Sequence, residues 1–207
     1  MNLFEEIPSS FSVAGIPAVH YGSHLNNFKN QYPDKLFYDN LRKLTGEYLS
    51  LDYAQMPRYV FLCGSPGSGK SHYLVGLYRA MIQKIGYLGG DGATFSTYPD
   101  LATEMISLFK EDIPLRIGMT PYLQSRWLFL DDCTSSERIL KENSLEHTML
   151  RDILVDRYDK GYCLLISSNL NAEDLMADLN RLCGGYIMSR MNDSKIIQFP
   201  NVDFRKK

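Results

Sequence analysis

A glycine-rich stretch that ends in lysine and serine is the part of the sequence whose residue types and spacing most clearly specify a chemistry. Residues 64 to 71 read GSPGSGKS and match the phosphate-binding pattern G-x-x-x-x-G-K-[ST] at every fixed position. The glycines let the backbone turn tightly, so that successive N–H groups face an anion. Lys70 would then reach the β- and γ-phosphates of ATP, and the Ser71 hydroxyl would bind Mg²⁺. The predicted ATP-binding residues are Gly64, Ser65, Pro66, Gly67, Ser68, Gly69, Lys70, Ser71 and His72.

Two aspartates follow an apolar run further along the chain. The run WLFLDD, residues 127 to 132, ends in Asp131 and Asp132. An acidic residue at the end of such a strand is the usual partner of a phosphate loop, so Asp131 is the predicted Mg²⁺ ligand, with a helix cap or solvated turn as the alternative. Asp132 is the candidate base that activates water. A base must come within about 2.6 to 3.2 Å of that water, and aspartate is one methylene shorter than glutamate, which predicts slow hydrolysis.

Short apolar runs alternate with helical patterns along the chain. Strands are expected at 58–63, 93–99, 127–132, 162–168 and 195–199, and helices at 35–53, 69–85, 100–109, 144–158, 171–182 and 186–192. This alternation predicts an α/β fold with a parallel sheet and helices on both faces. The glycine-rich stretch then lies between a strand and a helix, which argues against a turn without a ligand. A strand–helix unit separates the two motif strands and leaves room for an extra strand between them in the sheet.

The composition fits one globular domain. The chain has 207 residues, 44% of them hydrophobic, which suits one folded core and excludes wholesale disorder. Residues 1–34 are expected to be an extended segment on the surface of an ATPase domain formed by 35–207. A formal net charge of −2 means that any nucleic acid would need a local basic patch. The four widely spaced cysteines predict buried reduced thiols, and without a long apolar run we expect a cytoplasmic protein and no membrane partner.

With these motifs the sequence resembles the DnaC/IstB branch of the AAA+ ATPases, which comprises bacterial and phage helicase loaders and the ATPase helpers of transposases. Further stretches that carry the resemblance are IPSSF near the start, VDRYDKG before the fourth strand, ISSNL at its end, SRMND, and the closing strand with VDFR. The resemblance implies a P-loop NTPase fold of AAA+ type, with a parallel five-stranded sheet flanked by helices. Only eight residues follow Phe199, so no C-terminal helical lid is expected, and no adapter domain is expected before IPSSF.

The resemblance also implies roles for polar residues outside the two motifs. Asn169 matches the sensor that orients the attacking water, with a simple turn residue as the alternative. Arg190 matches the arginine finger, which in this family projects into the ATP of a neighbouring subunit. Arg157 is a second candidate finger, although an arginine at a helix end is more often a surface or salt-bridge residue. Arg205 contacts either the nucleotide or a subunit boundary, or belongs to a solvated basic tail. The predicted catalytic residues are Asp132, Asn169 and Arg190.

DNA contact is a further property that the resemblance implies. In the relatives, the region between the second and third strands lines a channel for DNA. Here that region contains the basic residues Lys110 and Arg116 and the aromatic residues Phe109 and Tyr122, which suit phosphate contact and base stacking. Nearby acidic residues offset the basic ones, so an ordinary solvated face is the alternative.

Three functions follow, in order of preference. The first is an accessory ATPase of DNA replication, a phage or mobile-element helicase loader that oligomerises on ATP and engages single-stranded DNA or a replicative helicase. It would hydrolyse ATP to ADP and phosphate slowly and only when assembled. The second is an IstB-like transposition regulator that assembles with ATP on duplex DNA and recruits a transposase. The third is a small-molecule kinase, for which the SSN and SRMND stretches have no evident use.

Overall fold

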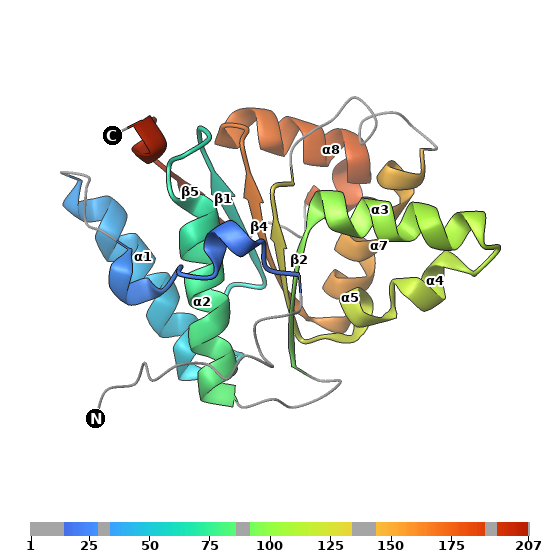
Figure 1. The fold of residues 1–207 in the computed structure, drawn as a ribbon, viewed down its shortest axis with the longest axis horizontal. Coiled ribbons are helices and arrows are strands. Elements are labelled where there is room, and N and C mark those ends of the chain that lie inside the picture. The colour runs from blue at the N-terminus through green and yellow to red at the C-terminus, as the bar shows by residue number, and fades with distance from the viewer. Residues whose placement is uncertain (1–14, 29–33, 86–91, 134–143, 189–193, 207) are drawn as a thin grey trace.

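A parallel sheet forms the centre of the molecule. It is seen in a computed structural model that describes residues 15–28, 34–85, 92–133, 144–188 and 194–206 (Figure 1). Within these residues the sheet has five strands in the order β2-β3-β4-β1-β5, and all neighbouring pairs are parallel. The strands are β1 (Tyr59–Cys63), β2 (Ala93–Thr97), β3 (Trp127–Asp131), β4 (Cys163–Ser168) and β5 (Lys195–Gln198). This confirms the predicted fold class.

The position of β4 determines which motifs meet. It lies between β1, which leads into the phosphate loop, and β3, which carries the aspartates. The predicted extra strand between the two motif strands is therefore present. In the register Cys63 pairs with Ser168, and Leu130 pairs with Ile166, so the three strands end at the same edge of the sheet. Loops that follow these strands must lie side by side there, as is usual for ligand sites of open parallel sheets.

Two groups of helices cover the two faces of the sheet (Figure 1). Alternate strand residues supply the two apolar cores: Val60 and Leu62 pack with the first group, and Phe61 and Cys63 with the second. The first group is α1 (Lys35–Ser50) and α2 (Lys70–Ile85). The second is α3 (Tyr98–Lys110), α5 (Thr120–Gln124), α7 (Leu145–Lys160) and α8 (Ala172–Met188), with the short α4 (Leu115–Gly118) between α3 and α5.

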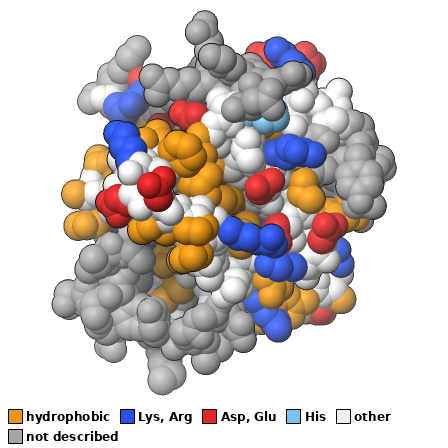
Figure 2. Space-filling view, turned by 90° about the vertical axis from the view of Figure 1, so that its right-hand side faces the viewer, with side chains coloured by type: hydrophobic (Ala, Val, Ile, Leu, Met, Phe, Trp, Pro, Cys, Tyr) orange, Lys and Arg blue, Asp and Glu red, His pale blue; other side chains and the backbone are white. Residues whose placement is uncertain are grey.

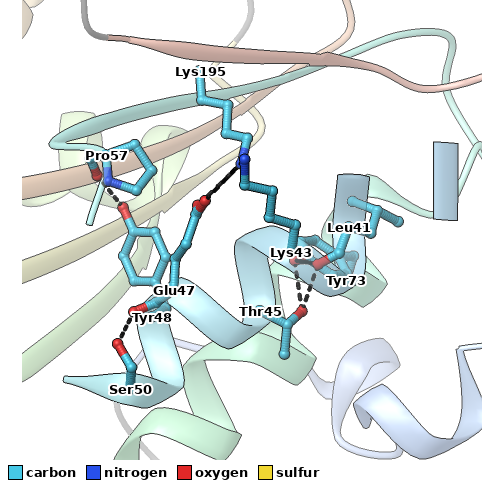
Figure 3. Close-up of polar contacts among 9 residues, drawn as sticks. All are labelled: Leu41, Lys43, Thr45, Glu47, Tyr48, Ser50, Pro57, Tyr73 and Lys195. Atoms are coloured by element: carbon cyan, nitrogen blue, oxygen red, sulfur yellow. Dashed lines mark hydrogen bonds and ion pairs between the residues drawn. The ribbon is translucent and has the colours of Figure 1, made fainter. Parts of the chain in front are cut away.

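Polar contacts fix α1 to its neighbours (Figure 3). The Tyr48 hydroxyl donates to the carbonyl oxygen of Pro57 at 2.7 Å, just before β1. Glu47 forms an ion pair of 3.0 Å with Lys195 at the start of β5. The Thr45 and Tyr73 hydroxyls lie 2.9 Å apart and connect α1 to α2. Helix α1 is thereby tied to the same elements that hold the phosphate loop.

A segment near the N-terminus lies over α2. Its two short 3-10 helices are η2 (Ala18–His20) and η3 (Leu25–Asn27). The chain approaches α2 so closely at Gly76 that a Cβ atom there would lie 2.9 Å from the backbone nitrogen of Leu25. Ile16 belongs to the first apolar core. Residues 1–14, the first part of the predicted N-terminal segment, lie outside the described residues.

Some predicted element boundaries were wrong. The strand predicted at 93–99 ends at Thr97, because the Thr97 hydroxyl accepts a hydrogen bond from the Asp100 N–H at 3.2 Å and caps α3. Helix α1 ends at Ser50 rather than at 53, and α4 and α5 were not predicted. The break predicted between the helices at 171–182 and 186–192 appears as a kink in α8, where Gly184 has a φ of 66°. Residues 189–193 lie outside the described part of the chain.

The sequence led to predictions about the cysteines and about membrane-spanning segments, and the structure bears on both. Cys63, Cys133 and Cys163 are buried free thiols, as predicted, and burial raises the pKa of Cys63 to about 11. Among the described residues, none of the helices is long and apolar enough to cross a membrane.

Arg157 is a buried structural residue of α7. Its side chain is fully buried, and burial lowers its pKa to about 10. It donates to the backbone carbonyl oxygens of Tyr122 at 2.6 Å, Arg126 at 3.1 Å, and Cys163. These acceptors lie in α5 and where β3 and β4 begin, at the opposite edge of the sheet from the phosphate loop. The interpretations of Arg157 as a second arginine finger and as a surface residue are therefore wrong.

Replacing Arg157 with methionine is expected to lower the free energy of unfolding by about 3 kcal/mol, because buried carbonyl oxygens would lose their donor. Urea unfolding of the variant and the parent measures this difference. The matched control is Arg151→Met on the exposed side of the same helix, which should change stability by less than about 0.5 kcal/mol. Equal destabilisation by the two substitutions would contradict a structural role for Arg157.

Candidate nucleotide-binding site

The phosphate loop joins the end of β1 to the start of α2. Lys70 opens the helix, and its ammonium group donates to the carbonyl oxygens of Gly64 at 2.7 Å and Ser65 at 2.8 Å, and to Asn169 Oδ1 at 3.0 Å. Burial lowers the pKa of Lys70, and the nearby Asp131 and Asp132 partly offset this effect. The lysine is therefore held in the loop by neutral acceptors that an anionic phosphate can replace.

Two glycines of the loop are required by the backbone conformation and by the close approach of neighbouring segments. Gly67 has a φ of 78° and Gly69 a φ of 94°, in the left-handed region that L-residues with a side chain rarely adopt. At Gly67 a Cβ atom would collide with the carboxylate of Asp203, and at Gly69 it would lie 3.2 Å from the ring of Phe28. The bare backbone is needed both for the turn and for the close approach of the segments that cover it.

Ser71 and Asp131 meet although they are far apart in the sequence. The Ser71 hydroxyl donates to Asp131 Oδ1 at 3.0 Å, and the Ser167 hydroxyl of β4 donates to the same oxygen. Asp131 is buried. A hydroxyl and a carboxylate beside a phosphate loop are oxygen ligands of the kind that Mg²⁺ uses together with nucleotide phosphates and water. These residues therefore fit the predicted metal. Among the described residues there is no group of three or more His, Cys, Asp or Glu side chains that could hold a metal by itself.

Asp132 and Asn169 form the next pair along this edge of the sheet. Asn169 Nδ2 donates to Asp132 Oδ1 at 2.9 Å, while Asn169 Oδ1 accepts from Lys70. Asp132 has a φ of 54°, a left-handed conformation in which aspartate is several-fold enriched over most residues with a side chain. The turn directs this exposed carboxylate toward Asn169, and the backbone geometry explains why a short acidic residue suits the position.

A cavity of about 740 Å³ connects these residues. Its size lies within the range of small-molecule sites. It is lined by the phosphate loop, Asp131, Asp132 and Asn169, and by three further segments. These segments are residues 17–28, the turn from β2 into α3, and residues 204–205. A nucleotide contact was one of the predicted roles of Arg205, whereas the first two segments were not predicted as parts of the site and carry no pattern of their own.

His72 belongs to the wall of this cavity. Its Nε2 lies 2.7 Å from Asn27 Oδ1 and 3.1 Å from the carbonyl oxygen of His24. Both partners are acceptors, so Nε2 carries the hydrogen. Burial is the largest cause that lowers the pKa of His72, which favours the neutral ring. His72 therefore holds the segment of residues 17–28 against α2, in addition to lining the site.

The predicted arginines lie in different places. Arg190 falls within residues 189–193 and thus outside the described residues. Arg205 is exposed and lines the cavity, where it forms an ion pair with Asp203. Arg157 is excluded from the site by its burial at the opposite edge of the sheet.

The predicted DNA-binding residues lie at the end of the molecule that α3 and α4 form. Lys110 and Arg116 are exposed there, and so is the ring of Phe109. Tyr122 is buried and its hydroxyl donates to Glu104 Oε2 at 2.7 Å, so its predicted availability for base stacking was wrong. Viewed toward this end, Lys and Arg side chains alternate with Asp, Glu and apolar side chains (Figure 2). This face shows no continuous basic patch in the part of the chain that the structure describes.

Comparison with known proteins establishes the fold. No protein-family model matches the sequence, and no curated protein matches it. Solved structures are similar. The DnaC helicase loader has a TM-score of 0.68 and 20% identity, over 89% of this chain and 100% of that chain. DnaI has a TM-score of 0.64 and 15% identity, over 90% and 93%. The initiator DnaA bound to AMPPCP and single-stranded DNA has a TM-score of 0.64 and 19% identity, over 90% of this chain and 52% of that chain.

The chain thus covers about half the length of the DnaA chain and nearly all of the DnaC and DnaI chains. At these identities the similarity shows the fold alone, a fold like that of the DnaC helicase loader. It is the fold that the sequence predicted.

Replacing Asp131 with asparagine is expected to weaken Mg²⁺-dependent binding of AMPPCP about 30-fold and to change binding without Mg²⁺ less. Asparagine keeps the shape and one acceptor oxygen but removes the charge that attracts the cation. Titration with and without EDTA measures this difference. Asp152→Asn, at an exposed position of α7, is the matched control and should behave like the parent. An unchanged response to Mg²⁺ in Asp131→Asn would show that Asp131 is not a metal ligand.

Proposed function

We propose that this chain is an ATP-dependent accessory ATPase of DNA replication that assembles on ATP and engages a helicase or single-stranded DNA. The observation that carries the proposal is the network at the carboxyl edge of the sheet. Lys70 contacts Asn169, Asn169 contacts Asp132, and Ser71 contacts Asp131. Residues from three strands are brought together there, beside a cavity of suitable size and in a fold similar to that of the DnaC helicase loader.

The residues divide the chemistry among them. Backbone N–H groups of the loop bind the phosphates, and Lys70 leaves its carbonyl acceptors to contact the β- and γ-phosphates. Ser71 and Asp131 would hold Mg²⁺, which would neutralise charge on the phosphates. Asp132 takes the proton of the attacking water, and Asn169 positions that water because it already contacts Asp132.

One component of the reaction is missing from this network. Among the described residues that line the cavity, the only Lys or Arg side chains are Lys70 and Arg205. We propose that Arg190 of a neighbouring copy supplies transition-state charge stabilisation. Turnover should then require assembly, while isolated subunits should still bind nucleotide. This dependence, together with the short Asp132 side chain, supports slow hydrolysis by isolated subunits.

The partners are part of the same proposal. DnaC is described as a helicase loader, and DnaA is described in complex with single-stranded DNA. For this chain we propose that Lys110 and Arg116 contact DNA phosphates. Each would do so separately rather than as part of a basic patch, because acidic side chains lie among the basic ones on that face. An origin in a phage or mobile element and a cytoplasmic location stay predictions of the sequence.

Size measurement by light scattering tests this function. The chain is measured with ADP, ATP and AMPPCP, each alone and with single- or double-stranded DNA. We expect larger assemblies with ATP and AMPPCP than with ADP, and further growth with single-stranded DNA. Growth with duplex DNA alone would support the transposition-regulator alternative. A monomer under all conditions that still hydrolyses ATP would contradict the proposal.

A further inference from the structure

Residues 199–205 contact the phosphate loop at its start and at Gly67. The Phe199 N–H donates to the carbonyl oxygen of Cys63 at 2.7 Å, immediately before the loop, and the Phe204 N–H donates to the carbonyl oxygen of Gly67 at 3.1 Å. Between these two bonds the carboxylate of Asp203 lies so close to Gly67 that a Cβ atom there would collide with it. A negative charge is therefore held in contact with a loop whose geometry suits an anion.

Asp203 also holds the side chain of Arg205. Arg205 Nε donates to Asp203 Oδ1 at 3.0 Å, and Arg205 Nη2 donates to Asp203 Oδ2 at 3.3 Å. The Arg205 side chain is 67% exposed, against 21% for Asp203, and Arg205 lines the nucleotide cavity. The two-point contact thus places a guanidinium group at the phosphate loop.

The two ends of this ion pair differ in how firmly they are held. The Asp203 carboxylate also accepts a hydrogen bond from the Arg205 backbone N–H at 3.0 Å and touches Gly67, so it stays near the loop. The exposed guanidinium is held only weakly by an ion pair of this kind. Phosphate offers it the same two-point geometry with more negative charge. A nucleotide in the cavity would therefore compete with Asp203 for Arg205.

We propose that Asp203 is a positioning residue of the nucleotide site, which holds Arg205 beside the phosphate loop and yields it to the phosphates of an entering nucleotide. The inference rests on the proposed function, since it assumes that the cavity binds ATP. Breaking the ion pair costs part of the binding free energy, so Asp203 keeps nucleotide affinity lower than the loop alone would allow. Nucleotide binding then releases the Arg205 guanidinium group from Asp203.

The Asp203→Asn variant isolates the charge, because asparagine keeps the oxygen that accepts from the Arg205 backbone N–H. Affinity for ADP and AMPPCP is measured by calorimetry in the parent, Asp203→Asn, Arg205→Gln and the double variant. We expect Asp203→Asn to bind about fivefold more tightly and Arg205→Gln about tenfold more weakly. In the Arg205→Gln background, Asp203→Asn should change affinity less than about twofold, because Asp203 acts through Arg205.

Controls separate this inference from stability and from the proposed function. Asp39 and Arg42 form a similar exposed ion pair on α1 at 3.3 Å, and Asp39→Asn and Arg42→Gln should leave affinity unchanged. Arg205→Lys should restore part of the loss seen in Arg205→Gln, which a purely structural role would not predict. Equal gains from Asp203→Asn in both backgrounds, a loss from Asp203→Asn, or normal affinity in Arg205→Gln would each overturn the inference. If the parent itself binds no nucleotide, the proposed function fails, and this inference fails with it.

Discussion

Lys70→Ala is expected to reduce ATP turnover about 10³-fold while the domain stays folded. In the proposed site the ammonium group contacts the β- and γ-phosphates, and two charge-assisted hydrogen bonds of about 2 kcal/mol each account for a loss of that size. The fold should tolerate the change, because the contacts of Lys70 seen in the structure are with neutral acceptors, the carbonyl oxygens of the loop and the Asn169 side chain.

Steady-state phosphate release and thermal unfolding of the same samples test this expectation. Lys84→Ala is the matched control, because Lys84 lies exposed in the last turn of the same helix α2. We expect this control to match the parent in both measurements. Turnover in Lys70→Ala equal to that of the parent would remove the phosphate loop from the mechanism. Unfolding of Lys70→Ala at the assay temperature would instead show that the lysine holds the loop together.

The sheet and the phosphate loop could be predicted because local sequence determines them. Each strand is a short apolar run, and GSPGSGKS sits between a strand and a helix, so type and spacing were sufficient. The meeting of Ser71 with Asp131 also followed, because parallel strands that flank β4 end at one edge of the sheet.

Other parts of the site depend on long-range contacts that no local pattern encodes. Residues 17–28 have no sustained period, and they reach the cavity only because Gly76 of α2 allows their backbone to approach. For Arg157 the local sequence pattern was misleading rather than absent. Its sequence context resembles that of a surface arginine at a helix end, and only the fold brings backbone carbonyls of three other elements around its guanidinium group.

The short side chain of Asp132 has a conformational reason that the sequence could not reveal. A left-handed residue at the end of β3 suits aspartate better than glutamate, and the turn brings the carboxylate within 2.9 Å of Asn169. The structure thus brings the two side chains together. Slow hydrolysis stays a prediction, and its two expected causes are the short reach of Asp132 and the need for charge stabilisation from outside the subunit.

Arg190→Ala is accordingly expected to lower turnover by assembled subunits about 10³-fold while leaving AMPPCP binding by isolated subunits near normal. Arginine fingers contribute about 10³ to 10⁵ in rate in comparable phosphoryl-transfer enzymes, because they stabilise charge that develops only in the transition state. Turnover per subunit, followed on dilution of the parent, should fall together with assembly size. Arg181→Ala is the matched control, since Arg181 is exposed on α8 and pairs only with Asp178 among the contacts seen there.

Mixing two inactive variants decides whether the arginine acts on its own subunit or on a neighbour. A Lys70→Ala subunit cannot use its own nucleotide but still carries Arg190, and an Arg190→Ala subunit has an intact phosphate loop. If Arg190 acts on the neighbour, an interface between the two pairs the intact loop with the intact arginine, and mixing should restore up to about a quarter of the parent turnover in a random assembly. If Arg190 acts within its own subunit, no mixture contains a complete site, and activity should stay at the level of the single variants. Recovery that requires ATP-dependent assembly would therefore locate the missing charge in the neighbouring copy, whereas full activity of Arg190→Ala alone would show that each subunit is a complete ATPase.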